Sequence, residues 1–202
     1  VTPLLPPNAT VRDARRRSPD LAGQEREIAI LFADLRSFTR FSEKKLPYDV
    51  VFVLNRYFAH MGEAVEEAGG HLDKFIGDGV MALFGTKTDV ASGARQALEA
   101  ASNMSKKLAE LNAQLGDELD EPLRIGIGVH AGPAIIGEMG YGTASGLTAI
   151  GDSVNTASRL EAMTMEFGAQ LIFSEDVAKH VSSNATSMEK HTAEVPGRNE
   201  KI

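Results

Sequence analysis

Two aspartates stand at points of this sequence where a carboxylate could hold a cation. Asp34 follows the apolar run 28–32, and Asp78 lies in the Gly-Asp-Gly corner of "DKFIGDGVMALFG". Hard divalent cations such as Mg²⁺ prefer carboxylate oxygens together with substrate phosphates. Two such ions about 3.5–4 Å apart can stabilise both ends of an in-line displacement at phosphorus. The pair indicates a metal site; the alternative is a helix cap at Asp34 and an ordinary turn residue at Asp78.

Three further polar residues have types and spacings suited to ligand binding. Lys74 precedes Asp78 by four residues in an apolar stretch, so its ammonium group must reach an acceptor or water. Asn155 and Arg159 are four residues apart in a predicted helix, which places them on one face. Their amide and guanidinium donors suit a ribose oxygen and a phosphate. A solvated lysine and a polar pair on a helix surface are the alternatives.

Hydrophobic periodicity predicts the elements that position the two aspartates. Apolar residues recur three and four apart within 47–70 and again within 89–115, which predicts two helices. The continuous run 28–32 predicts a strand buried on both faces, and 71–85 predicts a hairpin. In a β-α-β-β order, the end of the first strand and the tip of the hairpin are neighbours. We therefore expect Asp34 and Asp78 to lie close together.

The remaining pattern fixes the expected fold class. Alternation over 122–132 predicts a strand, 151–163 a helix and 169–175 a further strand. The resulting order predicts an α+β fold, a ferredoxin-like split βαβ sheet with helices on one face, extended by extra C-terminal elements. Residues 1–25 are rich in Pro and Arg and are expected to be a linker or connecting segment. Residues 26–202 form the expected folded domain, with its last strand truncated.

Composition excludes several classes of protein. With 28 acidic and 21 basic residues, the net charge of −7 argues against a nucleic-acid partner. The one basic cluster, "RDARRR", adjoins a Pro-rich stretch and favours a solvated linker over a binding arm. The absence of cysteine is compatible with a reducing cytoplasm. No apolar run approaches the roughly 18 residues of a membrane span. We expect a cytoplasmic domain, at the inner face of the membrane if a longer parent protein is anchored there.

Four motifs in order carry a resemblance to a known family. "ILFADLRSFT", "DKFIGDGVMALFG", "GIGVHAG" and "LTAIGDSVNTASRLEA" resemble the catalytic domain of the class III nucleotidyl cyclases, the adenylyl and guanylyl cyclases, over roughly residues 26–180. The resemblance implies that Asp34 and Asp78 bind two Mg²⁺ or Mn²⁺ ions per site. It also places the backbone around 35–38, with Phe38, near the triphosphate of the substrate.

The same resemblance implies roles for the other residues. Lys74 matches the purine-selecting lysine of adenylyl cyclases, where guanylyl cyclases have glutamate. Thr148 matches the second purine-selecting position, at which threonine marks a mainly bacterial subgroup of adenylyl cyclases. Asn155 corresponds to the asparagine that orients the ribose, and Arg159 to the arginine that stabilises the pentavalent phosphorus. Arg198, in "EVPGRNEKI", takes the place of a lysine that the family places on the triphosphate.

The resemblance thus implies an adenylate cyclase that converts ATP to 3′,5′-cyclic AMP and pyrophosphate. It implies a homodimer with shared sites, each taking its aspartates from one protomer and its purine, ribose and phosphate contacts from the other. The alternatives are a guanylyl cyclase, which Lys74 disfavours, and a degenerate domain that only binds nucleotide. A diguanylate cyclase would need a "GGDEF"-like hairpin, and "IGDGV" is not one.

Overall fold

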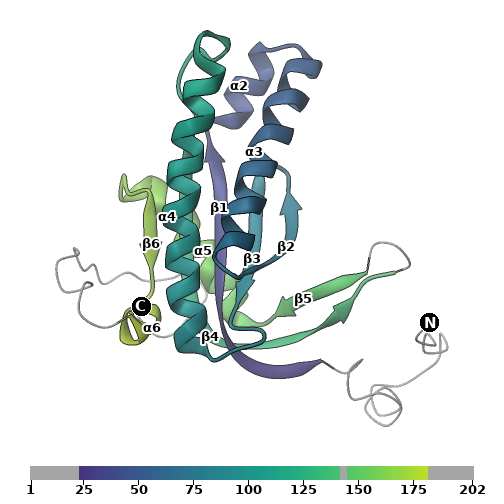
Figure 1. Cartoon of the computed structure of the whole chain (residues 1–202), viewed down its shortest axis with the longest axis vertical. Coiled ribbons are helices and arrows are strands. Elements are labelled where there is room, and N and C mark those ends of the chain that lie inside the picture. Colours follow the sequence, from purple (N-terminus) through teal and green to yellow (C-terminus); the bar gives the residue numbers. More distant parts are fainter. Residues whose placement is uncertain (1–22, 142–144, 182–202) are drawn as a thin grey trace.

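The computed structural model describes residues 23–141 and 145–181, and six strands and five helices run through this part of the chain (Figure 1). The strands are β1 (Gln24–Arg36), β2 (His71–Ile76), β3 (Gly79–Phe84), β4 (Arg124–Met139), β5 (Gly146–Ile150) and β6 (Leu171–Phe173). The helices are α2 (Phe38–Lys44), α3 (Pro47–Glu67), α4 (Val90–Leu115), α5 (Asp152–Glu166) and α6 (Glu175–His180), with the short 3-10 helix η2 (Gly116–Glu118) after α4.

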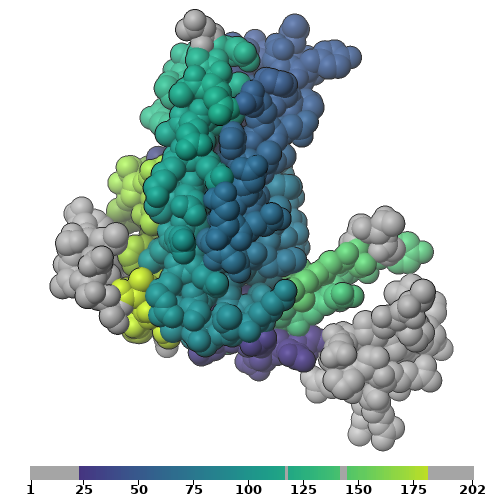
Figure 2. Space-filling model, viewed as in Figure 1, coloured from purple at the N-terminus to yellow at the C-terminus, as the bar shows by residue number. Residues whose placement is uncertain are grey.

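One sheet with the order β2-β3-β1-β4-β5 forms the centre of the molecule. The long antiparallel pair β1 and β4 runs from Gln24 opposite Ile136 to Arg36 opposite Arg124. On its other edge, β4 pairs with β6 in parallel near its start and with β5 in antiparallel fashion near its end. Beyond the body of the sheet, β4 and β5 continue as an arm that projects away from the helices (Figures 1 and 2).

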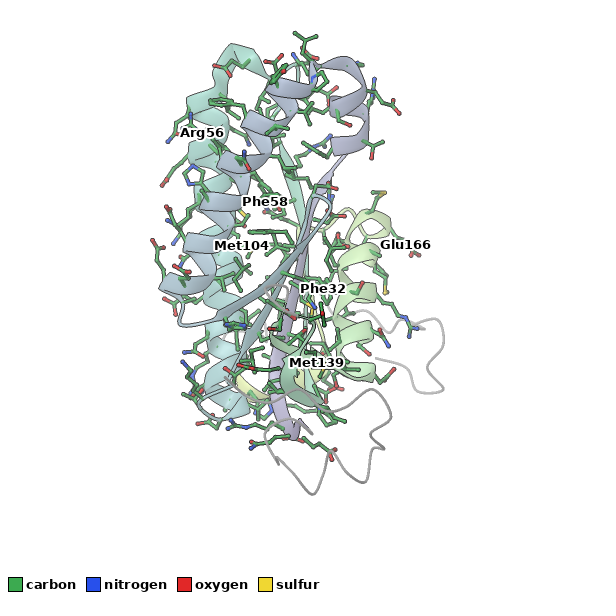
Figure 3. The ribbon with its side chains drawn as sticks, turned by 90° about the vertical axis from the view of Figure 1, so that its right-hand side faces the viewer. Phe32, Arg56, Phe58, Met104, Met139 and Glu166 are labelled. Carbon is green, nitrogen blue, oxygen red and sulfur yellow. The ribbon has the colours of Figure 1, made fainter. Side chains whose placement is uncertain are left out.

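The two faces of the sheet carry different helices. Alternate β1 residues, such as Leu31, point into a core shared with α3 and α4, whereas their neighbours, such as Ile30, point into a second, smaller core that includes Ala157 of α5. Figure 3 shows this division, with Phe58 and Met104 on the side of α3 and α4 and Phe32 on the side of α5. The predicted α+β class and split βαβ sheet are confirmed, but helices cover both faces instead of one.

Glycines in β4 explain why α5 lies so close to the sheet. A Cβ atom at Gly128 would lie 2.2 Å from the backbone nitrogen of Glu161 and 2.5 Å from the carbonyl oxygen of Ala157. At Gly126 it would meet the Thr164 hydroxyl oxygen at 2.3 Å. The backbone of α5 therefore packs directly on the backbone of β4. This contact fixes the height and position of the helix that carries Asn155 and Arg159.

The helices and the hairpin begin and end close to the predicted residues. Pro47 opens α3, where its missing N–H is not needed by the helix, and the Asp89 side chain accepts a hydrogen bond from the Ser92 amide at the start of α4. The helix α2 was not predicted. The proposed linker falls almost wholly on residues outside the described part of the chain. Among the described residues, we find no helix with the length and hydropathy that a membrane span requires.

Candidate active site

Asp34 and Asp78 lie together, as their positions in the sequence predicted. Asp34 is near the end of β1, and Asp78 follows Gly77 in the two-residue turn between β2 and β3. Gly77 has a φ of 63°, a conformation that glycine adopts without a steric cost. Next to it, a Cβ at Gly79 would lie 3.1 Å from the Ile76 carbonyl oxygen and 3.4 Å from Asp34 Oδ1, so this end of the hairpin packs closely on the end of β1. The strand end and the turn thus place two acidic side chains at one point.

The environment of Asp34 disfavours its charged form. Burial is the largest cause, followed by the charge of Asp78 and a hydrogen bond with it, and together they raise the pKa of Asp34 from 3.8 to about 6. The amide of Leu35 donates to Asp34 Oδ1 at 3.1 Å, which acts in the opposite direction. Two carboxylates that repel one another at a half-buried site are suited to a bound cation.

A third carboxylate, Glu161 of α5, faces the same region. Burial and the charges of Asp34 and Asp78 raise the pKa of Glu161 to about 7, while the charge of Arg36 lowers it. Beneath them, the fully buried Tyr57 has its pKa raised by burial and then by the three carboxylates, and its hydroxyl has no hydrogen-bond partner among the described residues. Sequence reasoning missed both residues, although Glu161 stands two positions after Arg159 on a predicted helix.

Arg36 ties the end of β1 to the C-terminal part of α5. Its Nη2 atom donates to the carbonyl oxygen of Thr164 at 3.0 Å and to that of Ala169. The element bearing Asp34 is thereby joined to the helix bearing Asn155 and Arg159.

Lys74 and Thr148 meet although they belong to opposite edges of the sheet. Lys74 Nζ of β2 donates to Thr148 Oγ1 of β5 at 3.0 Å. The Thr148 hydroxyl in turn donates to Asp73 Oδ2 at 2.5 Å. Close by, His71 Nε2 donates to the carbonyl oxygen of Leu147 at 3.1 Å. The structure thus brings together the two predicted purine-contacting residues and adds Asp73, which the sequence did not single out.

Asn155 and Arg159 share a face of α5, as their spacing predicted. Asn155 is exposed and Arg159 is half-buried. The Nη1 atom of Arg159 is buried, and within the described ranges it has no hydrogen-bond partner. A buried guanidinium nitrogen without a partner is suited to an anionic ligand, because an unsatisfied charged donor is costly.

The other candidate residues have simpler surroundings. Phe38 opens α2 and stacks on Phe41 with ring centres 5.7 Å apart, half-buried against the core. Arg198 lies outside the described residues. His130 is buried, and its Nδ1 lies 2.8 Å from the Ser174 hydroxyl.

The chemistry of the acidic pair fits a divalent cation. The negative charge of Asp78 helps to raise the pKa of Asp34, because the two carboxylates repel one another. A cation bound between them would attract both charges and so favour the ionised form of each. In the described part of the chain, no three histidine or acidic side chains form a metal cluster. Backbone, water and substrate oxygens would have to complete the coordination shell, as is usual for Mg²⁺.

Comparison with known proteins agrees with this geometry. A split βαβ sheet with paired carboxylates at a strand end and a hairpin tip is the arrangement expected of class III nucleotidyl cyclases. Residues 22–202 match the family described as "Adenylate and Guanylate cyclase catalytic domain", and the chain belongs to this family.

Individual relatives are similar over most of the chain. The adenylate cyclase of Anabaena cylindrica is 36% identical over 185 residues, which is 90% of this chain and 36% of that protein. The crystal structure of the guanylyl cyclase Cya2 superimposes with a TM-score of 0.80 at 31% identity, covering 89% of this chain and 90% of that chain. The crystal structure of the adenylyl cyclase CyaB from P. aeruginosa superimposes with a TM-score of 0.79 at 27% identity, covering 90% of this chain and 93% of that chain. This chain therefore spans about a third of the length of the Anabaena relative.

Proposed function

We propose that this domain is an adenylate cyclase that converts ATP to 3′,5′-cyclic AMP and pyrophosphate. The observation that carries the proposal is the pair Asp34 and Asp78, which folding holds together despite their repulsion. Such a pair is useful where divalent cations must be held beside phosphates. The named adenylate cyclase from Anabaena and the adenylyl cyclase CyaB support the nucleotide class.

The other residues supply contacts to the substrate. Lys74 and Thr148 are joined by a hydrogen bond and present a donor and an acceptor suited to the edge of adenine. Asn155 orients the ribose so that its 3′-oxygen points at the α-phosphorus. Arg159 brings its unpaired Nη1 to the phosphate, where negative charge grows in the transition state.

Asp34 and Asp78 hold Mg²⁺ or Mn²⁺, two ions per site. When bound, such ions lower the pKa of the attacking hydroxyl and stabilise the leaving pyrophosphate. The fold of this chain contributes to metal binding by holding one carboxylate at the end of β1 and the other at the tip of the β2–β3 hairpin.

We further propose that two copies of the chain pair with two-fold symmetry and share their sites. The support for this arrangement is membership of the cyclase family, for which the sequence resemblance implies a homodimer with shared sites. In a symmetric pair, the acidic residues of one protomer would meet the base, ribose and phosphate contacts of the other.

The test is to incubate the purified chain with ATP and Mn²⁺ at several protein concentrations and to measure cyclic AMP by chromatography. Specific activity should rise with concentration as dimers form. Asp34→Asn and Asp78→Asn should each lose at least about a hundredfold in kcat while their circular dichroism is unchanged. Asp120 is an exposed aspartate that pairs with Lys45, so Asp120→Asn is the matched control and should keep full activity.

Two outcomes would contradict the proposal. Absence of a cyclic product from ATP at every concentration would exclude an adenylate cyclase. A higher kcat/KM for GTP than for ATP would assign the domain to the guanylyl cyclases, the class of the similar Cya2 structure.

A further inference from the structure

Three polar side chains form a closed set where β2 and β5 meet. The Thr148 hydroxyl lies 2.5 Å from Asp73 Oδ2 and 3.0 Å from Lys74 Nζ, and Lys74 Nζ lies 3.4 Å from Asp73 Oδ1. The Asp73 side chain is only 3% exposed, whereas that of Lys74 is 46% exposed. Asp73 therefore lies behind the pair, and Lys74 faces outward, where a ligand can reach it.

An irregularity in β2 makes this set possible. Successive side chains of a regular strand point to opposite faces, so Asp73 and Lys74 could not both reach Thr148. The register between β2 and β3 shifts between Leu72 and Lys74, which leaves Asp73 as the extra residue of a β-bulge. Bulges re-aim side chains and are frequent beside functional sites.

The chemistry of the three groups fixes the direction of the Thr148 hydroxyl. An ionised carboxylate only accepts hydrogen bonds, and an ammonium group only donates them. The hydroxyl must therefore donate its one hydrogen to Asp73 and accept from Lys74. A hydroxyl has one hydrogen to donate and two lone pairs that accept, so Thr148 keeps one lone pair for a ligand and has no hydrogen left to donate to it.

We propose that Asp73 is a positioning residue that sets base specificity, because it makes Thr148 an obligatory hydrogen-bond acceptor. The inference rests on the proposed function and names a determinant of its substrate. Adenine offers an amino group that donates to Thr148 and a ring nitrogen, N1, that accepts from the free hydrogen of Lys74. Guanine offers the reverse, a carbonyl oxygen at C6 and an N1–H donor. The C6 oxygen of guanine would face the lone pair of Thr148.

The test is the ratio of kcat/KM for ATP to that for GTP in Asp73→Ala. This change removes the acceptor and frees the Thr148 hydrogen to donate to the guanine oxygen, whereas asparagine would keep an amide oxygen that can still accept from Thr148. We expect the ratio to fall at least about tenfold, because GTP gains a hydrogen bond from Thr148 and ATP loses the obligatory acceptor for its amino group. The ratio is independent of the fraction of folded enzyme, so a merely structural role would leave it unchanged. Asp120→Asn, with the same change of charge, should keep the original ratio.

A double-mutant cycle isolates the path through Thr148. In a Thr148→Val background no hydroxyl remains to be oriented, so adding Asp73→Ala should change the ratio less than about twofold. An equal fall in both backgrounds would overturn the proposal, as would an unchanged ratio in Asp73→Ala alone. If the unaltered chain makes no cyclic AMP, the proposed function fails first, and the inference falls with it.

A second measurement needs no variant and covers the case in which Asp73→Ala does not fold. The unaltered enzyme is given ATP, purine riboside triphosphate, which has no substituent at C6, and inosine triphosphate, which has the oxygen. An acceptor-only Thr148 predicts the order of kcat/KM ATP, then purine riboside triphosphate, then inosine triphosphate. Inosine triphosphate turned over as well as or better than purine riboside triphosphate would mean that Thr148 donates, and would refute the role of Asp73.

Discussion

Replacing Asp34 with asparagine should stabilise the metal-free fold. Asparagine keeps an oxygen for the Leu35 amide and removes one of two repelling charges. The pKa of Asp34 is raised from 3.8 to about 6 in the folded chain, so above pH 6 the folded state must carry a charge that the unfolded state carries more easily. Stability therefore falls as the pH rises from about 4 to about 6, and Asp34→Asn should reduce this fall to the part that Glu161, with its pKa raised to about 7, contributes.

The magnitude follows from the same pKa. A rise from 3.8 to about 6 has an upper bound of about 3 kcal/mol in the free energy of unfolding. Because Asp34 is only half-buried, solvent screening reduces this to about 1–2 kcal/mol. For a domain of this size, the melting temperature should rise by about 3–6 °C.

The assay is thermal melting followed by circular dichroism, in EDTA, at pH 5 and pH 8. The variant should melt higher than the unaltered chain at pH 8, and the difference should shrink at pH 5. With Mn²⁺ the order should reverse, since only the unaltered chain keeps both carboxylates. Asp120→Asn controls for the change of net charge. An Asp34→Asn chain that melts no higher than the unaltered chain at pH 8 in EDTA would refute the reasoning.

Three other predictions concern the shared sites and the backbone. An equal mixture of inactive Asp78→Ala and Asn155→Ala chains should recover about a quarter of full activity, because half of the dimers are mixed and each mixed dimer has one intact site of its two. No recovery after confirmed mixing would argue against shared sites. Gly128→Ala should cost about 1–3 kcal/mol in urea unfolding, since the new Cβ meets the Glu161 nitrogen at 2.2 Å; an unchanged midpoint would show that α5 can retreat. Ser37→Gly should stabilise by about 1 kcal/mol, because Ser37 has a φ of 61°; a lower melting temperature would mean that the serine side chain outweighs the backbone strain.

Much of the fold follows from local pattern, and so does the acidic pair. The three-four spacing of apolar residues predicts α3 and α4, and the continuous run before Asp34 predicts a buried strand. The proximity of Asp34 and Asp78 follows from the order of the elements alone. These features depend on hydrophobic periodicity and on short connections, both of which are local properties of the chain.

The features that sequence reasoning missed depend on backbone geometry. Gly126 and Gly128 have the spacing of a half-buried strand, and nothing in that spacing says that a helix backbone will lie on them. Asp73 precedes Lys74, so the alternation of a regular strand assigns the two side chains to opposite faces; only the bulge brings them together. The start of α2 depends on the left-handed conformation of Ser37, which serine rarely adopts.

The projecting arm of β4 and β5 has a mechanical consequence for the proposed base site. Thr148 lies on the arm, and its hydrogen bonds to Asp73 and Lys74 join the arm to the β2–β3 hairpin, whose tip carries Asp78. A movement of the arm relative to the hairpin would therefore disturb these hydrogen bonds, and with them the groups that we propose to select the nucleotide.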